Sequence, residues 1–173
     1  MRLVNFEWDG ERCLGALDGE NVVDLSDSGL PNDTIDLIAQ WDRAKTEHAV
    51  GQGSRMPLAG LRLLAPILPR KNIVAVGRNY RDHAREFSDS GFDASEKQMI
   101  PEHPVIFTKA PTAVIGPDES IVLANDPTGT TDYEGEMAVV IGRTARNVSP
   151  ERALDHVFGW TIVNDVTARE LQK

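Results

Sequence analysis

The chain has 173 residues, of which 40% are hydrophobic and 26% charged, and this balance is typical of a globular protein long enough to bury a core. Its net charge of -9 and its lack of a basic cluster argue against a nucleic-acid partner. The first residues are too polar for a secretory signal and no segment approaches the length of a membrane span, so we expect a soluble, cytoplasmic protein without a membrane partner. The single cysteine, Cys13, excludes an internal disulfide.

The first seventy residues are expected to form a small β-rich domain. Residues 2–25 predict a three-stranded antiparallel meander, because two Asp-Gly pairs supply turn residues between three apolar runs. One helix of about a dozen residues is expected after Asp33. Residues 61–67 contain a proline and favour an extended edge segment. We place a boundary near Pro69, which gives domains at 1–69 and 70–173.

The character of the sequence changes after this boundary. Residues 73–76 predict a short buried strand, and residues 79–87 have a helical composition. On such a helix His83 and Glu86 share a face and can form a carboxylate-histidine pair, although an ordinary surface pair is the alternative. Residues 88–102 are polar and have no clear period, which predicts a mobile loop or lid.

Further elements bring polar residues to the ends of strands. Lys109 is the last residue of one predicted strand, where its ammonium can point into a site at the strand end. A solvated lysine is the alternative. Asp165 follows another predicted strand. Ser149 is expected to cap a short helix that has Pro150 at its first position. The expected elements are strands at 104–109 and 121–123, a strand of the buried type at 158–163 and the helix at 150–157.

Two glutamates, Glu134 and Glu136, open an otherwise apolar run that ends at Ile141. In a strand, period-two alternation places both on one face with Ala138 and Val140, with the glutamate Cα atoms about 6.6 Å apart. Carboxylates this close require a positive group between them if they are shielded from water. An exposed strand end with two solvated glutamates is the alternative.

With Asp165 as a third acid, Glu134 and Glu136 would form an all-oxygen site. Such a site suits Mg²⁺, Mn²⁺ or Ca²⁺ rather than zinc, and three acids leave coordination positions open for substrate oxygens. The residues therefore predict a Lewis acid that holds an enolisable oxo acid, with the pair His83 and Glu86 handling water or a proton. Removing any one of the three acids is expected to abolish cation binding with little loss of fold, because repulsion between them is relieved.

Four motifs follow one another in this part of the chain. They are residues 76–80 with His83 and Glu86, residues 107–109, residues 132–142 and residues 159–172. Their sequences and their order resemble the fumarylacetoacetate hydrolase family over residues 71–173. The first seventy residues resemble only loosely the small N-terminal domain that some members carry.

The resemblance implies roles for eight residues. Glu134, Glu136 and Asp165 would be the metal ligands. The lid dyad that activates water would be His83 and Glu86. The substrate contacts would be Arg78, Lys109 and Gln172.

The resemblance also implies a fold and an assembly. The fold would be α+β and mostly β, with a small N-terminal β-rich domain followed by a mixed β-roll, and members are usually dimeric. We therefore expect a homodimer that binds a small-molecule oxo acid. Family members continue beyond the position equivalent to Lys173, so we expect a C-terminally truncated chain and an incomplete roll.

The leading hypothesis is a divalent-metal-dependent hydrolase that cleaves a carbon-carbon bond in a 2-oxo or 1,3-dioxo acid, such as an acylpyruvate or a fumarylacetoacetate-like compound. The alternative within enzymes is a decarboxylase or isomerase acting on oxaloacetate or on a 2-hydroxyhepta-2,4-diene-1,7-dioate. It requires the same enolate but no attacking water. A third hypothesis, from another class, is an inactive, truncated metal-binding module.

Overall fold

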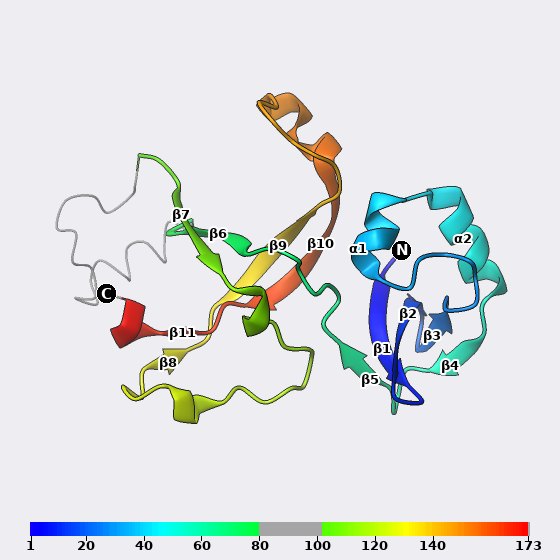
Figure 1. The fold of residues 1–173 in the computed structure, drawn as a ribbon, viewed down its shortest axis with the longest axis horizontal. Helices are drawn as coiled ribbons and strands as arrows, with labels where there is room; N and C mark the ends of the chain where they lie inside the picture. The colour runs from blue at the N-terminus through cyan, green and yellow to red at the C-terminus, as the bar shows by residue number, and fades with distance from the viewer. Residues whose placement is uncertain (80–101, 173) are drawn as a thin grey trace. The chain divides into compact units, whose positions relative to one another are not determined.

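The computed structural model describes residues 1–79 and 102–172, and the fold is α+β with strands predominating, as expected (Figure 1). The chain forms two compact units, each built from several segments. Unit 1 contains Met1–Arg70, Pro111–Glu119 and Ile141–Phe158, and unit 2 contains Lys71–Ala110, Ser120–Val140 and Gly159–Lys173. Because each unit combines three separate segments, this division does not test a single domain boundary, and the boundary near Pro69 stays a prediction.

Unit 1 contains a five-stranded antiparallel sheet in the order β4-β3-β2-β1-β5. The predicted meander is confirmed, and the segment expected at a sheet edge supplies the edge strand β5 beside β1. The strands are β1 (Leu3–Trp8), β2 (Glu11–Asp18), β3 (Asn21–Asp24), β4 (Arg55–Pro57) and β5 (Arg62–Leu64).

Two helices, α1 (Thr34–Ala39) and α2 (Arg43–Gln52), lie where the sequence predicted one. The expectation of a single helix is wrong because each helix has its own cap. The carboxylate of Asp33 accepts hydrogen bonds from the first turn of α1, and that of Asp42 accepts from the backbone of Lys45 in α2. The helices and sheet share a core of Leu14, Ala16, Val23, Leu25, Leu30, Leu37 and Ala49.

Unit 1 also contains two 3₁₀ helices. These are η1 (Pro111–Ala113) and η3 (Pro150–His156). The short helix expected after Ser149 is thus confirmed in position, although it is a 3₁₀ helix and Ser149 makes no side-chain cap hydrogen bond.

Unit 2 contains small antiparallel strand pairs. The expected strands β6 (Ile73–Gly77) and β7 (Val105–Lys109) pair with each other, so that Ile73 lies opposite Lys109. A second pair joins β8 (Thr131–Asp132) to β11 (Thr167–Ala168).

The strand predicted at 121–123 is wrong, because the segment instead turns into the 3₁₀ helix η2 (Leu123–Asn125). Its backbone hydrogen bonds are local: the Asn125 amide donates to the carbonyl of Val122, and the Asp126 amide donates to that of Leu123.

A further pair joins β9 (Gly135–Ile141) to β10 (Val157–Asn164). Burial alternates along β9 with period two, and Glu136, Ala138 and Val140 share one face, as predicted. This face is the less exposed of the two. The expectation that residues 158–163 and 73–76 are buried is wrong, since Ile162 is 84% exposed and Val74 is 66% exposed. A pair of strands has no second layer of its own to cover its side chains.

Parts of the sequence prediction lie outside the described residues. They are most of the helix expected at 79–87 and nearly all of the loop expected at 88–102. In the part of the chain that the structure describes, no helix is long and apolar enough to cross a membrane.

Candidate functional site

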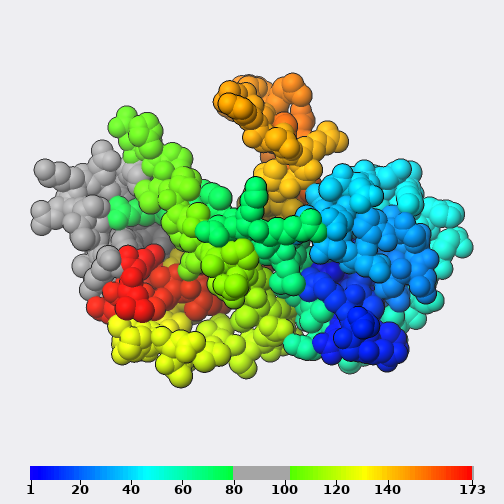
Figure 2. Space-filling model, in the orientation of Figure 1, coloured from blue at the N-terminus to red at the C-terminus, as the bar shows by residue number. Residues whose placement is uncertain are grey.

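The candidate site lies within unit 2, where the end of β7 meets the chain around β8 and β11. In Figure 1, β11 and the 3₁₀ helix η4 (Arg169–Gln172) lie beside β8. The pairing of β11 with β8 places Thr167 opposite Asp132. Figure 2 shows the same red residues against the yellow segment that leads into β9. The acids named from the sequence occur at this junction.

Glu134 and Asp165 are fixed side by side by their backbones. The amide of Asp165 donates a hydrogen bond of 2.8 Å to the carbonyl oxygen of Glu134. The amide of Glu134 in turn donates to the side-chain oxygen Oδ1 of Asn164 at 2.9 Å. Two acids that lie 31 positions apart in the sequence are therefore neighbours, and their backbone geometry does not depend on the state of their carboxylates.

Arg169 supplies the positive group that the sequence required near the glutamates. Its Nη1 donates to Oε1 of Glu134 at 2.6 Å, while Nε and Nη2 both donate to Oδ2 of Asp132 at 3.1 and 2.9 Å. The side chains of Arg169 and Glu134 are only 15% and 16% exposed. A shielded arginine thus bridges two acids with charge-assisted hydrogen bonds, which are among the stronger kinds in proteins.

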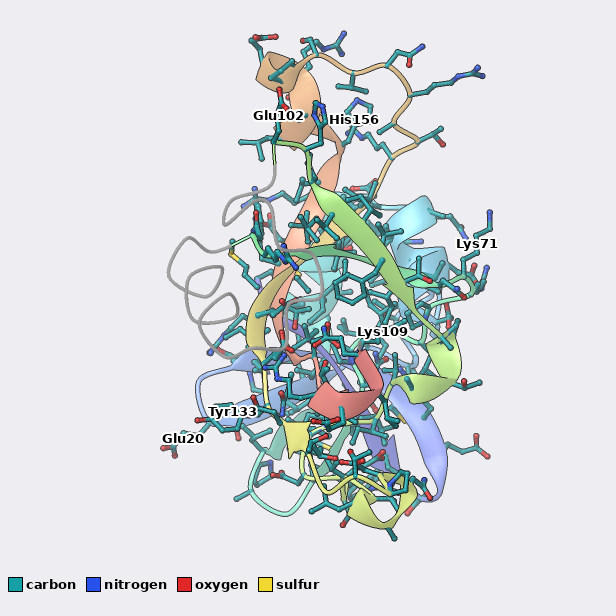
Figure 3. All side chains as sticks on the ribbon, turned by 90° about the vertical axis from the view of Figure 1, so that its left-hand side faces the viewer. Glu20, Lys71, Glu102, Lys109, Tyr133 and His156 are labelled. Carbon is teal, nitrogen blue, oxygen red and sulfur yellow. The ribbon has the colours of Figure 1, made fainter. Side chains whose placement is uncertain are left out.

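Lys109 neutralises the third acid. Its Nζ lies 2.7 Å from Oδ1 of Asp165, and it also lies 3.1 Å from the carbonyl oxygen of Val166 and 3.5 Å from Oγ1 of Thr167. Asp165 is 10% exposed and Lys109 is 32% exposed. Figure 3 shows Lys109 beside the red ribbon of the C-terminal residues. The strand end does point the ammonium into the site, while the predicted contact with substrate stays a prediction.

The other predicted site residues are placed as follows. Glu136 lies in β9 on the same, less exposed face as Ala138. Arg78 follows β6 with a φ of 54°, in the left-handed region. Gln172 is exposed in η4, and its Oε1 accepts a 3.4 Å hydrogen bond from Nη1 of Arg169. His83 and Glu86 lie outside the described residues.

Within residues 1–79 and 102–172, no three His, Cys, Asp or Glu side chains form a group that could hold a metal ion. The ion pairs give a physical reason for the absence of such a group, because Arg169 holds the carboxylate of Glu134 and Lys109 holds that of Asp165. Each ion pair uses one oxygen of its carboxylate, and a carboxylate has two. By ligand type the acids suit a hard divalent cation, whereas their arrangement is that of an ion-pair network.

The sequence reasoning assigned no role to Arg169 or Asp132, although both lie in the quoted motifs. One signal was available: closely spaced acids require a positive group, and Arg169 comes only four positions after Asp165. What the sequence did not show was that this arginine would turn back to residues 35 and 37 positions earlier in the chain.

Known proteins were compared with this chain. The family model described as "Fumarylacetoacetate (FAA) hydrolase C-terminal" matches residues 72–173. "Oxaloacetate tautomerase YisK" of Bacillus subtilis (strain 168) is 40% identical over 178 residues, which cover 91% of this chain and 56% of that protein. The chain therefore spans somewhat more than half the length of this relative.

Two solved structures are similar over 99% of the chain. One is a fumarylacetoacetate hydrolase from psychrophilic Exiguobacterium antarcticum, with 36% identity, a TM-score of 0.77 and 58% of that chain covered. The other is a 2-hydroxyhepta-2,4-diene-1,7-dioate isomerase from Mycobacterium marinum, with 33% identity, a TM-score of 0.66 and 56% of that chain covered.

Proposed function

The chain belongs to the fumarylacetoacetate hydrolase family, and from this premise we propose that it carries the centre of an enzyme that interconverts enol and keto forms of a 2-oxo dicarboxylic acid. The observation that carries the proposal is the pairing of Glu134 with Arg169 and of Asp165 with Lys109 at one junction of strands. A relative named as an oxaloacetate tautomerase and a structural neighbour named as an isomerase support this reaction class over hydrolysis.

The reaction requires little more than proton transfer and charge stabilisation. The enol loses its hydroxyl proton and gains a proton at the adjacent carbon, and no bond between heavy atoms breaks. The negative enolate oxygen formed on the way is stabilised by fixed positive groups. Lys109 and Arg169 supply such groups, and we assign the transfer of the proton to His83 and Glu86.

We further propose that Glu134, Glu136 and Asp165 hold a divalent cation, with Mg²⁺ preferred over Mn²⁺ or Ca²⁺. A 2-oxo dicarboxylate is a dianion, and the described part of the site holds more acids than bases, so a cation is needed to admit the substrate. When bound, the cation would supply a Lewis acid for the oxo oxygen and the enolate. In Glu134 and Asp165, the carboxylate oxygen that the ion pair does not use is the natural ligand.

Arg169→Met is expected to tighten Mg²⁺ binding by roughly tenfold. At about 5 Å in a water-like dielectric, a unit charge and a divalent cation repel each other by about 1.7 kcal/mol, and the substitution removes this repulsion. Calorimetric titration with Mg²⁺ and Mn²⁺ measures the affinity directly, whatever the activity of the variant.

Arg62→Met is the matched control for this experiment. Arg62 also bridges two acids, Glu7 and Glu119, but it does so in unit 1 with a side chain 58% exposed. Its loss should leave the cation affinity unchanged. An Arg169→Met protein that binds Mg²⁺ no more tightly than wild type would contradict the assignment of Glu134 as a ligand beside the arginine.

The proposed reaction is tested by following the ultraviolet absorbance of enol oxaloacetate after mixing with the protein. We expect ketonisation to exceed the buffer-catalysed rate, to fall to that rate after chelation, and to recover when Mg²⁺ is added. If the protein binds Mg²⁺ but leaves the rate unchanged for both oxaloacetate and an acylpyruvate, the inactive metal-binding module is favoured instead.

Hydrolysis of a carbon-carbon bond is the second candidate, supported by the structural neighbour named as a fumarylacetoacetate hydrolase. It uses the same enolate, formed here as the carbon-carbon bond of the substrate breaks, and in addition an activated water. Release of pyruvate from an acylpyruvate, without faster ketonisation of oxaloacetate, would favour this candidate over tautomerisation.

A further inference from the structure

We propose that Asp126, which lies in the loop before β8, is a positioning residue that holds the guanidinium of Arg169 beside the carboxylate of Glu134. The inference rests on the proposed function only in that Glu134 is taken as part of the reactive centre. The sequence analysis assigned no role to Asp126. Three successive sets of contacts connect it to the centre.

The first set closes the loop around the carboxylate of Asp126. Its Oδ1 accepts hydrogen bonds from the amide of Thr128, at 2.9 Å, and from the hydroxyl of the same residue. Its Oδ2 accepts from the amide of Thr130 at 2.7 Å and from the hydroxyl of Thr131 at 2.8 Å. Both carboxylate oxygens therefore hold the segment between η2 and β8.

These hydrogen bonds favour the charged form of the acid. The hydrogen bond from the side chain of Thr128 lowers the pKa of Asp126 most. With those from the Thr128 amide, Thr131 and Thr130, it holds this pKa well below its ordinary range. The carboxylate is thus ionised throughout the neutral range and can accept from all of these donors at once.

The second set joins this loop to the beginning of η4. The carbonyl oxygen of Thr130 accepts a hydrogen bond from the amide of Arg169 at 3.1 Å, and its hydroxyl accepts from the amide of Glu170 at 3.0 Å. The β8 and β11 pairing, with Thr131 opposite Ala168, continues the connection. The loop that Asp126 organises therefore holds the backbone from which the arginine side chain starts.

The third set is made by the arginine itself, which reaches Asp132 and Glu134 with three hydrogen bonds of 2.6 to 3.1 Å. Such bonds weaken steeply when distance or angle changes. A shift of the Arg169 backbone would therefore disturb the hydrogen bonds of its guanidinium directly. A general loss of stability would disturb them less. This distinguishes a positioning residue from one that only closes a turn.

The test is a double-mutant cycle on Mg²⁺ affinity with Asp126→Ala, Arg169→Met and the double variant. If Asp126 acts through the arginine, Asp126→Ala should tighten Mg²⁺ binding by about threefold, part of the roughly tenfold expected for Arg169→Met. In the Arg169→Met background the same change should have no further effect. Equal effects in both backgrounds, or none in either, would overturn the proposal.

Two further measurements keep the test independent of folding and of the proposed function. Asp126→Asn retains one acceptor oxygen and should show a smaller shift than Asp126→Ala. The NMR signal of the Arg169 Nε–H group, identified by its loss in Arg169→Met, should move in both Asp126 variants but not in the control Asp155→Ala. A moved signal without Mg²⁺ binding would sink the proposed metal and keep the positioning role, whereas an unmoved signal would overturn that role.

Discussion

Asp165→Ala is expected to abolish the binding of Mg²⁺ and Mn²⁺ and to lower the free energy of unfolding by about 1–3 kcal/mol, because a hydrogen bond between two partly shielded charged groups is lost. The side chain of Asp165 is 10% exposed and lies 2.7 Å from the ammonium of Lys109. The substitution leaves that ammonium without its counter-charge. The sequence expectation of little loss of fold considered only repulsion between the acids, whereas the ion pair is a reason to expect a measurable loss.

Glu134→Ala should also lose cation binding but should destabilise the fold less than Asp165→Ala. Its partner Arg169 retains two hydrogen bonds to Asp132, so its charge stays neutralised. The order of the two variants in stability therefore tests the ion-pair arrangement separately from the metal.

Calorimetric titration gives the cation affinity of each variant, and urea denaturation followed by circular dichroism gives its stability. Asp155→Ala is the control, since Asp155 pairs with Arg152 on an exposed surface where such pairs contribute about 0–1 kcal/mol. Unchanged cation affinity in both Asp165→Ala and Glu134→Ala would refute the metal assignment. A stability loss for Asp165→Ala no greater than that of the control would refute the ion-pair account.

His83→Ala is expected to slow the hydrolysis of an acylpyruvate by roughly 10²- to 10⁴-fold, the usual contribution of a general base. Hydrolysis requires the deprotonation of a water molecule, whereas decarboxylation and tautomerisation of oxaloacetate do not. Decarboxylation should therefore lose less, whereas tautomerisation, whose proton transfer we assign to His83 and Glu86, should lose a similar factor. The comparison distinguishes a histidine that deprotonates water from one that transfers a proton in all of the enolate reactions.

Steady-state assays of both substrates on one preparation provide the measurement. His48→Ala is a suitable control, because His48 is exposed on α2 in unit 1 and should leave both rates unchanged. Equal losses of acylpyruvate hydrolysis and oxaloacetate decarboxylation in His83→Ala would count against water activation as the particular role of this residue and would favour a shared proton transfer.

Local patterns in the sequence were sufficient for much of the fold. The turn residues of the first 25 positions predicted the meander, because a tight turn with alternating side chains is encoded by neighbouring residues. The period of two along residues 134–140 likewise predicted that both glutamates share one face, and this face is the less exposed one in the structure. The motifs of residues 71–173 identified the family, which the comparison with known proteins confirmed.

Only the tertiary structure decided which charges meet. Lys109 pairs with Asp165, 56 positions away, and Arg169 pairs with Asp132 and Glu134 rather than with an acid near it in the sequence. These contacts depend on the pairing of β8 with β11 and on the loop around Asp126. No local pattern encodes them, because an ion pair between distant residues forms only after the strands that carry them have been brought together.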